Sequence, residues 1–222
     1  MLTPGLYAVE FAVVTLARVP VLADVEARSE QLMLVRLEEQ PEGWRGYQTV
    51  CDVRVDGGGI AEAEIPDAFV KATGSKWTDV TMDGTTYSAD LGINHAGWHL
   101  VDEDDVMPVE LEDERVYDWD DDGEPAATIW VHAPLFGRIT LNVVQKSRSV
   151  LRGTFTEAGT VEGTVDMLYL QQRTLGASNF LFAGNIALEP QSDKSSFRLW
   201  DVRDDMSCAA LVSETWGPED TW

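Results

Sequence analysis

Hydrophobic and polar residues alternate along most of the chain, which is the pattern of half-buried β-strands. In the segment 47–55, Tyr47, Cys51 and Val53 fall on one face and Gln48 falls on the other. We interpret this segment as a strand whose Cys51 side chain points toward the core. The same alternation predicts strands at 6–17, 30–38, 127–133, 138–145, 148–156, 160–171 and 196–203.

The clearest turn signal is Asp83-Gly84, which separates two alternating segments, 77–82 and 85–91. An Asp-Gly pair suits a two-residue type I′ turn, so these segments are expected to form a β-hairpin. A helical pattern is confined to 65–71, where Pro66 suits the first helical position. Many short strands with little helix predict an all-β fold, either a barrel or a sandwich of about ten mostly antiparallel strands.

The 222 residues include 44% hydrophobic residues, enough for a full-sized core. The only break in composition is the segment 102–124, which holds 13 Asp or Glu residues and one Arg. We expect this segment to be a long acidic surface loop, because burying so many carboxylates would remove their hydration. The alternating strand pattern is the same before and after the loop, which favours a single all-β domain over residues 1–222.

The chain is strongly acidic, with a formal net charge of −23. Nucleic acid is not an expected partner, because phosphate binding needs clustered Lys and Arg. If the acidic loop serves as a docking site, its partner should be a basic protein surface. No transmembrane segment is expected, since the most apolar stretch, 6–23, is interrupted by Glu10 and Arg18.

Two cysteines, Cys51 and Cys208, lie near opposite ends of the chain. The even number of cysteines and the predicted inward direction of the Cys51 side chain favour a disulfide, although two buried free thiols are an open alternative. A disulfide would indicate an oxidising location, that is a periplasmic, cell-surface or secreted protein.

The sequence Asp118-Trp119-Asp120-Asp121-Asp122-Gly123 places three carboxylates at alternate positions before a glycine. Asp118, Asp120, Asp122 and the carbonyl of Glu124 match positions 1, 3, 5 and 7 of a calcium loop. Over residues 118–129 the chain resembles the DxDxDG loops of EF-hands, dockerins, thrombospondin type 3 repeats and FG-GAP repeats. No family resemblance extends over the whole chain. The local resemblance implies a bound Ca²⁺ ion with a structural role.

The loop also departs from an EF-hand, because Ala126 stands at position 9 and Ile129 at position 12. The residues that follow form a strand pattern rather than a helix, so a calcium loop leading into a strand is the closer analogue. A further carboxylate would have to come from Glu110, Glu112 or Asp113. Mg²⁺ is an alternative ion, and a solvated acidic turn without metal is the alternative interpretation.

Catalytic signatures such as GxSxG, HExxH, GxGxxG and the P-loop are absent from the sequence. His95, His99 and His132 could together hold a metal, which would make the protein a hydrolase or metalloenzyme. Trp98 and Trp119 flank the acidic loop and are candidates for an exposed platform that stacks on carbohydrate.

The function expected from the sequence is therefore non-enzymatic. We expect a calcium-stabilised protein outside the cytoplasm that binds a ligand, for which carbohydrate is one candidate, or a protein partner. The first alternative is a closed barrel that carries a small apolar ligand, as lipocalins do. A metalloenzyme or hydrolase is the second alternative. An apolar interior cavity, an exposed aromatic patch or a polar cleft would distinguish the three.

Overall fold

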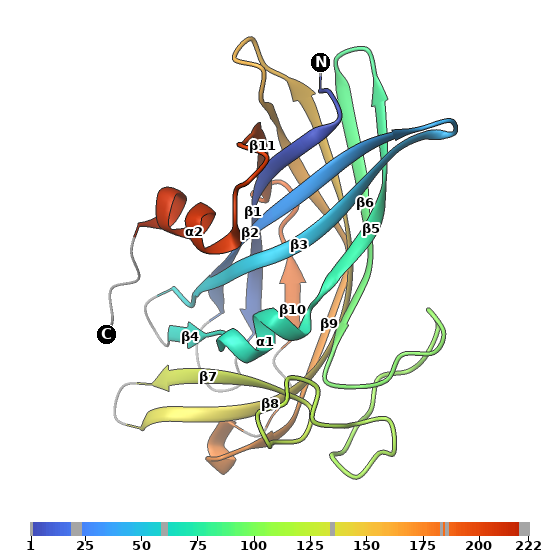
Figure 1. The fold of residues 1–222 in the computed structure, drawn as a ribbon. Coiled ribbons are helices and arrows are strands. Elements are labelled where there is room, and N and C mark those ends of the chain that lie inside the picture. The colour runs from blue at the N-terminus through green and yellow to red at the C-terminus, as the bar shows by residue number, and fades with distance from the viewer. Residues whose placement is uncertain are drawn as a thin grey trace.

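The computed structural model describes residues 2–18, 24–58, 62–133, 136–182, 184 and 187–217 (Figure 1). Eleven strands form one antiparallel sheet. They are β1 (Gly5–Arg18), β2 (Val25–Gln40), β3 (Gly43–Asp56), β4 (Glu62–Glu64), β5 (Ser75–Asp83), β6 (Thr86–Ala96), β7 (Ala127–Ala133), β8 (Gly137–Phe155), β9 (Val161–Ala177), β10 (Ala187–Pro190) and β11 (Ser196–Asp201). The helical elements are α1 (Asp67–Ala72), α2 (Cys208–Trp216) and a short 3₁₀ turn, η1 (Phe180–Phe182).

Eight of these strands pair in a closed circuit that runs β1-β2-β3-β5-β6-β8-β9-β11 and returns to β1. The remaining three are attached to this ring. β4 pairs with β3 and β7, β7 pairs with β8, and β10 pairs with the C-terminal half of β1. The all-β prediction is confirmed, and the single ring-like sheet replaces the two separate sheets of a sandwich.

Alternation along the strands fills one end of the ring with large apolar side chains. On β1, for example, Tyr7, Val9 and Phe11 are buried in the same cluster. Strands from the whole ring contribute to this cluster, including Met33, Val35, Leu37, Val80, Tyr87, Leu91, Leu151, Val165, Phe197 and Leu199. This end of the ring is therefore closed by its own core.

The hairpin of β5 and β6 is confirmed, but its turn lies one residue later than predicted, at Gly84-Thr85, because Asp83 still pairs with Thr86. Only Gly84 of these two residues has a positive φ, 57°, so the turn is not the predicted type I′ turn. The two strands expected at 138–145 and 148–156 are instead one continuous strand, β8. Its register shifts against β9 between Arg148 and Ser149, so a β-bulge takes the place of the expected break. The helix at 65–71 is confirmed as α1, which begins at Asp67.

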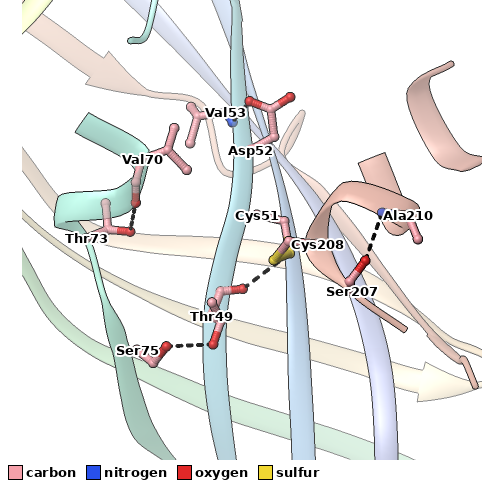
Figure 2. Close-up of a disulfide and its surroundings, with 10 residues drawn as sticks. All are labelled: Thr49, Cys51, Asp52, Val53, Val70, Thr73, Ser75, Ser207, Cys208 and Ala210. Carbon is pink, nitrogen blue, oxygen red and sulfur yellow. Dashed lines mark hydrogen bonds between the residues drawn. A yellow bond between two sulfur atoms is a disulfide. The ribbon is translucent and has the colours of Figure 1, made fainter. Parts of the chain in front are cut away.

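The disulfide between Cys51 and Cys208 is present, but the predicted inward direction of Cys51 is wrong (Figure 2). Leu32 pairs with Asp52 and Met33 with Val50, so Cys51 is the extra residue of a β-bulge. The bulge turns Cys51 toward the outer face, where it packs with the cluster beneath α2. The cluster contains Leu6, Ala8, Leu32, Met206 and Leu211.

The helix α2 is fixed to the outside of the ring by contacts besides the disulfide. The Ser207 side chain accepts a hydrogen bond from the Ala210 amide and caps the helix N-terminus, as Figure 2 shows. At the other end, the Trp216 indole donates a 2.8 Å hydrogen bond to Glu10 on β1. The C-terminal part of the described chain thus covers an apolar patch on the outer face of β1 and β2.

The acidic segment 102–124 contains turns, bends and isolated bridges but no strand, as the sequence predicts. Arg115 holds it locally through bonds to Asp113, which lower the pKa of that carboxyl to about 2. Cations from β8 and β9 hold it to the ring. The Lys146 ammonium donates to the Glu103 carbonyl, Arg148 pairs with the Glu103 side chain at 2.9 Å, and Arg173 donates to the Pro108 carbonyl.

Candidate functional site

The end of the ring opposite the core encloses a cavity of about 330 Å³. Phe11, Met33 and Leu91, which belong to the core, form part of its wall. α1, β4 and β7 lie at this end of the ring (Figure 1), and each supplies residues to the lining. The cavity is therefore a hollow in the ring itself.

Each strand contributes alternate residues to the cavity, because successive side chains of a strand point to opposite faces. On β1 the lining residues are Phe11, Val13, Thr15 and Ala17, and on β2 they are Ala27, Ser29, Gln31 and Met33. β3 contributes Gln48 and Val50 before the Cys51 bulge and Val53 and Val55 after it. The bulge adds one residue to the strand and so keeps apolar side chains of both halves facing inward.

Space for the cavity arises because small side chains replace large ones at this end of the ring. The small lining residues come from five strands and include Ala17, Ala27, Ser29, Ala63, Ala96, Ser147 and Ser149. In the core end, the equivalent inward positions carry Tyr, Phe, Leu and Met. The interior is thus filled at one end and hollow at the other.

The lining contains no carboxylate among the residues described, although 39 of the 222 residues of the chain are Asp or Glu. Lys76 is the one Lys or Arg in this described lining, and His95 is its one histidine. The acidic surface and the cavity are therefore electrostatically distinct environments.

Lys76 and Gln48 are direct cross-strand partners on β5 and β3, and both line the cavity. The Lys76 ammonium donates hydrogen bonds to the Asn94 side-chain oxygen at 2.6 Å and to the Ile93 carbonyl at 3.1 Å. Burial lowers the pKa of Lys76 to about 8, against the opposing effect of Asp90. The Gln48 side-chain oxygen is buried and has no hydrogen-bond partner within the described residues, and Gln48 is only 5% exposed.

The acidic loop brings together three of the predicted ligands. Asp118, Asp120 and Asp122 each offer a carboxylate oxygen within 4.8 Å of the other two. Asp118 accepts hydrogen bonds from the amides of Asp122 and Gly123, which folds the loop into a tight turn. The amide of Glu124 donates to the Asp122 carboxylate, while the metal-ligand role of the Glu124 carbonyl stays a prediction.

Asp120 is the buried member of the acidic triad, with 6% of its surface exposed. One carboxylate oxygen accepts a 2.9 Å hydrogen bond from the Thr128 amide at the start of β7. The other oxygen is buried and has no hydrogen-bond partner in the described part of the chain. Burial raises the pKa of Asp120, since a low-dielectric environment disfavours the charged form. A cation between the three carboxylates would compensate this charge.

Trp119 connects the acidic triad to the cavity. Its flanking residues in the chain are Asp118 and Asp120, and its own side chain lines the cavity. The Trp119 ring packs edge to face on Phe69 of α1, with a centroid distance of 5.1 Å. The sequence interpretation of Trp119 as an exposed platform does not fit this position.

Trp98 is completely buried, so its predicted exposure is wrong. Its ring packs with Met107, Ala126 and Val144, and its indole N–H donates to the Gln145 carbonyl. A surface aromatic platform built from Trp98 and Trp119 is not what the structure contains.

The three histidines have separate surroundings. His132 lies 2.6 Å from the Glu64 carboxylate, His99 stacks on Tyr117 with a centroid distance of 4.0 Å, and His95 lines the cavity. Within the described residues, the acidic triad is the only group of three or more potential ligand side chains close enough to share a metal. The histidines are not brought together as a metal centre.

A second hollow, of about 740 Å³, lies between β9 and the residues 103–107 of the acidic segment. It is wider and more open to solvent than the cavity, and it is lined by acids as well as by Lys146 and Arg173. Since enclosure and apolar lining distinguish small-molecule sites, the cavity inside the ring is the stronger candidate site.

Comparison with protein-family models, with curated proteins and with solved structures gave no match to this chain. None of the described helices is both long enough and apolar enough to cross a membrane. The fold and the site together define an all-β, ring-like protein with an apolar internal cavity beside an acidic loop.

Proposed function

We propose that the protein is a non-enzymatic binder that holds a small, mainly apolar molecule inside the ring. The observation that carries this proposal is the apolar cavity of about 330 Å³ between the core and α1. Its volume lies within the usual range for small-molecule sites, and its lining is mainly apolar, with one Lys, one His and neutral Ser, Thr, Asn and Gln side chains. Of the functions expected from the sequence, the carrier of a small apolar ligand is therefore the one best supported.

The unpaired side-chain oxygen of Gln48 also supports a binding role. A buried polar atom without a partner is destabilising, so such atoms are uncommon in folded proteins. A ligand that forms a hydrogen bond with the Gln48 amide, in either of its two orientations, would remove the penalty. The cavity wall thus carries a polar group for which the protein itself provides no partner in the described residues.

The neutral fluorophore N-phenyl-1-naphthylamine provides a direct test of cavity binding. We expect its fluorescence to rise on saturable binding with a dissociation constant in the range of about 1–10 μM, the strength that roughly 7–8 kcal/mol of binding free energy provides. Ala27→Trp should abolish this binding, because the indole would fill the cavity next to Thr15.

Arg28→Trp is the matched control, since it places the same side chain on the exposed outer position of the same strand. This variant should bind the fluorophore like the parent protein. Equal binding by both variants would show that the fluorophore attaches outside the ring and would contradict the proposal.

We infer in addition that the loop 118–124 binds a Ca²⁺ ion with a structural role. The unpartnered, buried oxygen of Asp120 beside two further carboxylates is the observation in favour. Hard divalent cations prefer such all-oxygen sites, and the tight turn at Gly123 brings the ligands together. Mg²⁺ is the alternative ion, distinguished by testing both.

Calcium is expected to raise the melting temperature. Binding to the native state alone stabilises by about 2.7 kcal/mol at one hundred times the dissociation constant, or roughly 5–10 °C for a chain of this size. Asp120→Asn should remove the shift because it removes a charged ligand without changing its shape. Asp121→Asn should retain the shift, since Asp121 is an exposed neighbour outside the triad. Equal melting with calcium and with chelator would exclude the calcium site.

The Cys51–Cys208 bond supports the proposal that the protein functions outside the cytoplasm, because disulfides persist in oxidising compartments. The periplasm, the cell surface and the extracellular medium are all compatible with this bond. Such a location also suits a calcium-binding loop, since extracellular calcium sites commonly operate at high calcium concentrations.

A further inference from the structure

Lys76, the one Lys or Arg of the described cavity lining, lies where β3, β5 and β6 meet. Gln48 on β3 faces Lys76 on β5, and Lys76 reaches across to Asn94 on β6. All three line the cavity, and Asn94 is exposed, which places this polar corner at the entrance. The remaining wall is mainly aliphatic and aromatic, with neutral Ser, Thr and Gln side chains between. The cavity therefore has one cationic end, and the rest of its described lining carries no other Lys or Arg and no carboxylate.

Lys76 forms no direct ion pair with a carboxylate among the described residues, although the charge of Asp90 acts on it from further away. Its two hydrogen bonds go to neutral oxygens, and an ammonium has three donors, so one N–H group is left to offer to a ligand. The nearby Asp90 is engaged by Arg148 at 2.7 Å. Within the described residues no carboxylate lies within ion-pair distance of the Lys76 ammonium. A half-buried ammonium in this state is stabilised by any anion that reaches it.

Gln48 lies beside this ammonium and can present either end of its amide to a ligand. The two orientations of a glutamine amide differ only by exchange of oxygen and nitrogen, and the hydrogen-bond partners decide between them. Since the oxygen has no partner within the described residues, little opposes this exchange. Rotated, the amide would donate an N–H to the same anion that binds Lys76.

On this basis, and resting on the proposed function, we propose that the cavity takes an amphiphile with one terminal carboxylate and a single apolar chain, the carboxylate bound by Lys76 and Gln48. A methylene group fills about as much space as a liquid water molecule, roughly 30 Å³, so the cavity accepts a chain of about ten to twelve carbons.

The charge of the lining selects a monoanion. An amine would meet the Lys76 ammonium without any acid among the described lining residues to pair with it. A phosphate dianion would bring a second charge for which this lining holds no second fixed cation, and an unpaired buried charge is costly. A carboxylate offers one charge and accepts hydrogen bonds from both Lys76 and Gln48.

The experiment compares decanoate with 1-decanol, which has the same chain and no charge. Binding is measured by isothermal titration calorimetry at pH 7 and by displacement of N-phenyl-1-naphthylamine. Decanoate should bind about 10–100-fold more tightly, the range expected for a charge-assisted hydrogen bond. Lys76→Met should reduce this ratio to near one by weakening the binding of decanoate, while 1-decanol is still bound.

Lys71→Met is the matched control, because it removes the same charge from an exposed position on α1 that does not line the cavity. It should leave the preference for decanoate intact. A preference that is lost equally in both variants would assign the effect to the overall charge of the protein and overturn the role of Lys76.

A pH series tests the same contact without a substitution. The groups that act on Lys76 are Asp90 and His95, whose pKa values are both lowered, so above pH 7 Asp90 stays ionised and His95 stays neutral. Raising the pH from 7 to 10 therefore deprotonates mainly Lys76 within this cluster. Decanoate affinity should fall across this interval while 1-decanol affinity stays constant.

Two results would overturn the carboxylate assignment while leaving the proposed function in place. One is equal affinity for decanoate and 1-decanol, and the other is tighter binding of decylamine than of decanoate. If neither the fluorophore nor any of these amphiphiles binds in calorimetry, the proposed function itself is wrong. The two failures are thus separated by the neutral ligands.

Discussion

Removal of the Cys51–Cys208 bond is expected to cause the largest loss of stability of any single covalent change. The bond joins residues separated by 157 positions. In the chain-entropy description, closing a loop of this length restricts the unfolded chain by about 5 kcal/mol. The double variant Cys51→Ala/Cys208→Ala should therefore melt about 10–20 °C below the parent protein, as followed by circular dichroism.

Reductant provides the control for this result. It should lower the melting temperature of the parent protein toward that of the double variant and have no effect on the double variant itself. α2 is also held by Leu211 in the apolar cluster and by the Trp216–Glu10 hydrogen bond, so the ring should keep its β spectrum after reduction. Melting temperatures within about 1 °C of each other would show that the loop closure contributes little.

Truncation of Trp98 is expected to have the second largest effect. Trp98→Ala should lower the free energy of unfolding by about 3–5 kcal/mol, the usual cost of removing a buried tryptophan. The side chain is 0% exposed, and its loss would leave a cavity among Met107, Ala126 and Val144 and an unpaired Gln145 carbonyl. The corresponding fall in melting temperature is about 6–20 °C.

Trp77→Ala is the matched control, because Trp77 is 44% exposed on the outer side of β5. Its loss removes contacts with Tyr47 and Arg45 on the surface and should cost less than about 1 kcal/mol. If both variants melt at similar temperatures, Trp98 is not a main anchor of the acidic segment, despite its bridge to Val116.

The strand pattern of this chain could be predicted because alternation is a local signal. Gly84 likewise marks the hairpin turn, although not its exact residues, and the spacing of Asp118, Asp120 and Asp122 brings their carboxylates together in the structure. The helix α2 also has local signals, Ser207 as N-cap and Gly217 after its end, although the hydrophobic pattern does not predict it. These features depend on residues that are close in sequence.

The direction of Cys51 could not be predicted in the same way. Sequence alternation assumes that every second residue of a strand faces the same side. The extra residue of a β-bulge breaks this rule, so the residues on the two sides of the bulge in β3 follow opposite alternations. Gln48 and Val50 consequently face inward although the alternation of Tyr47 and Cys51 places Gln48 outside. One inserted residue thus determines which polar side chain enters the cavity.

The cavity itself and the burial of Trp98 depend on long-range pairing. The polar corner combines Gln48, Lys76 and Asn94 from three strands, and no short window of sequence contains all of them. The acidic segment shows the same limitation, since Arg115 is its only local cation while Lys146, Arg148 and Arg173 come from strands that follow it. Such contacts require the strand order to be known.

Closure of the ring also affects how the protein behaves at high concentration. Each ring strand has partners on both sides, but β9 pairs with β11 only over residues 161–164, so the second side of its residues 166–177 has no described strand partner. Among the described strands, β10 alone pairs with a single neighbour, and it spans four residues ending at Pro190. A short edge that ends in proline is a poor template for intermolecular β-pairing. Aggregation through the β10 edge is therefore not expected, and the one-sided part of β9 is the edge that remains for such pairing.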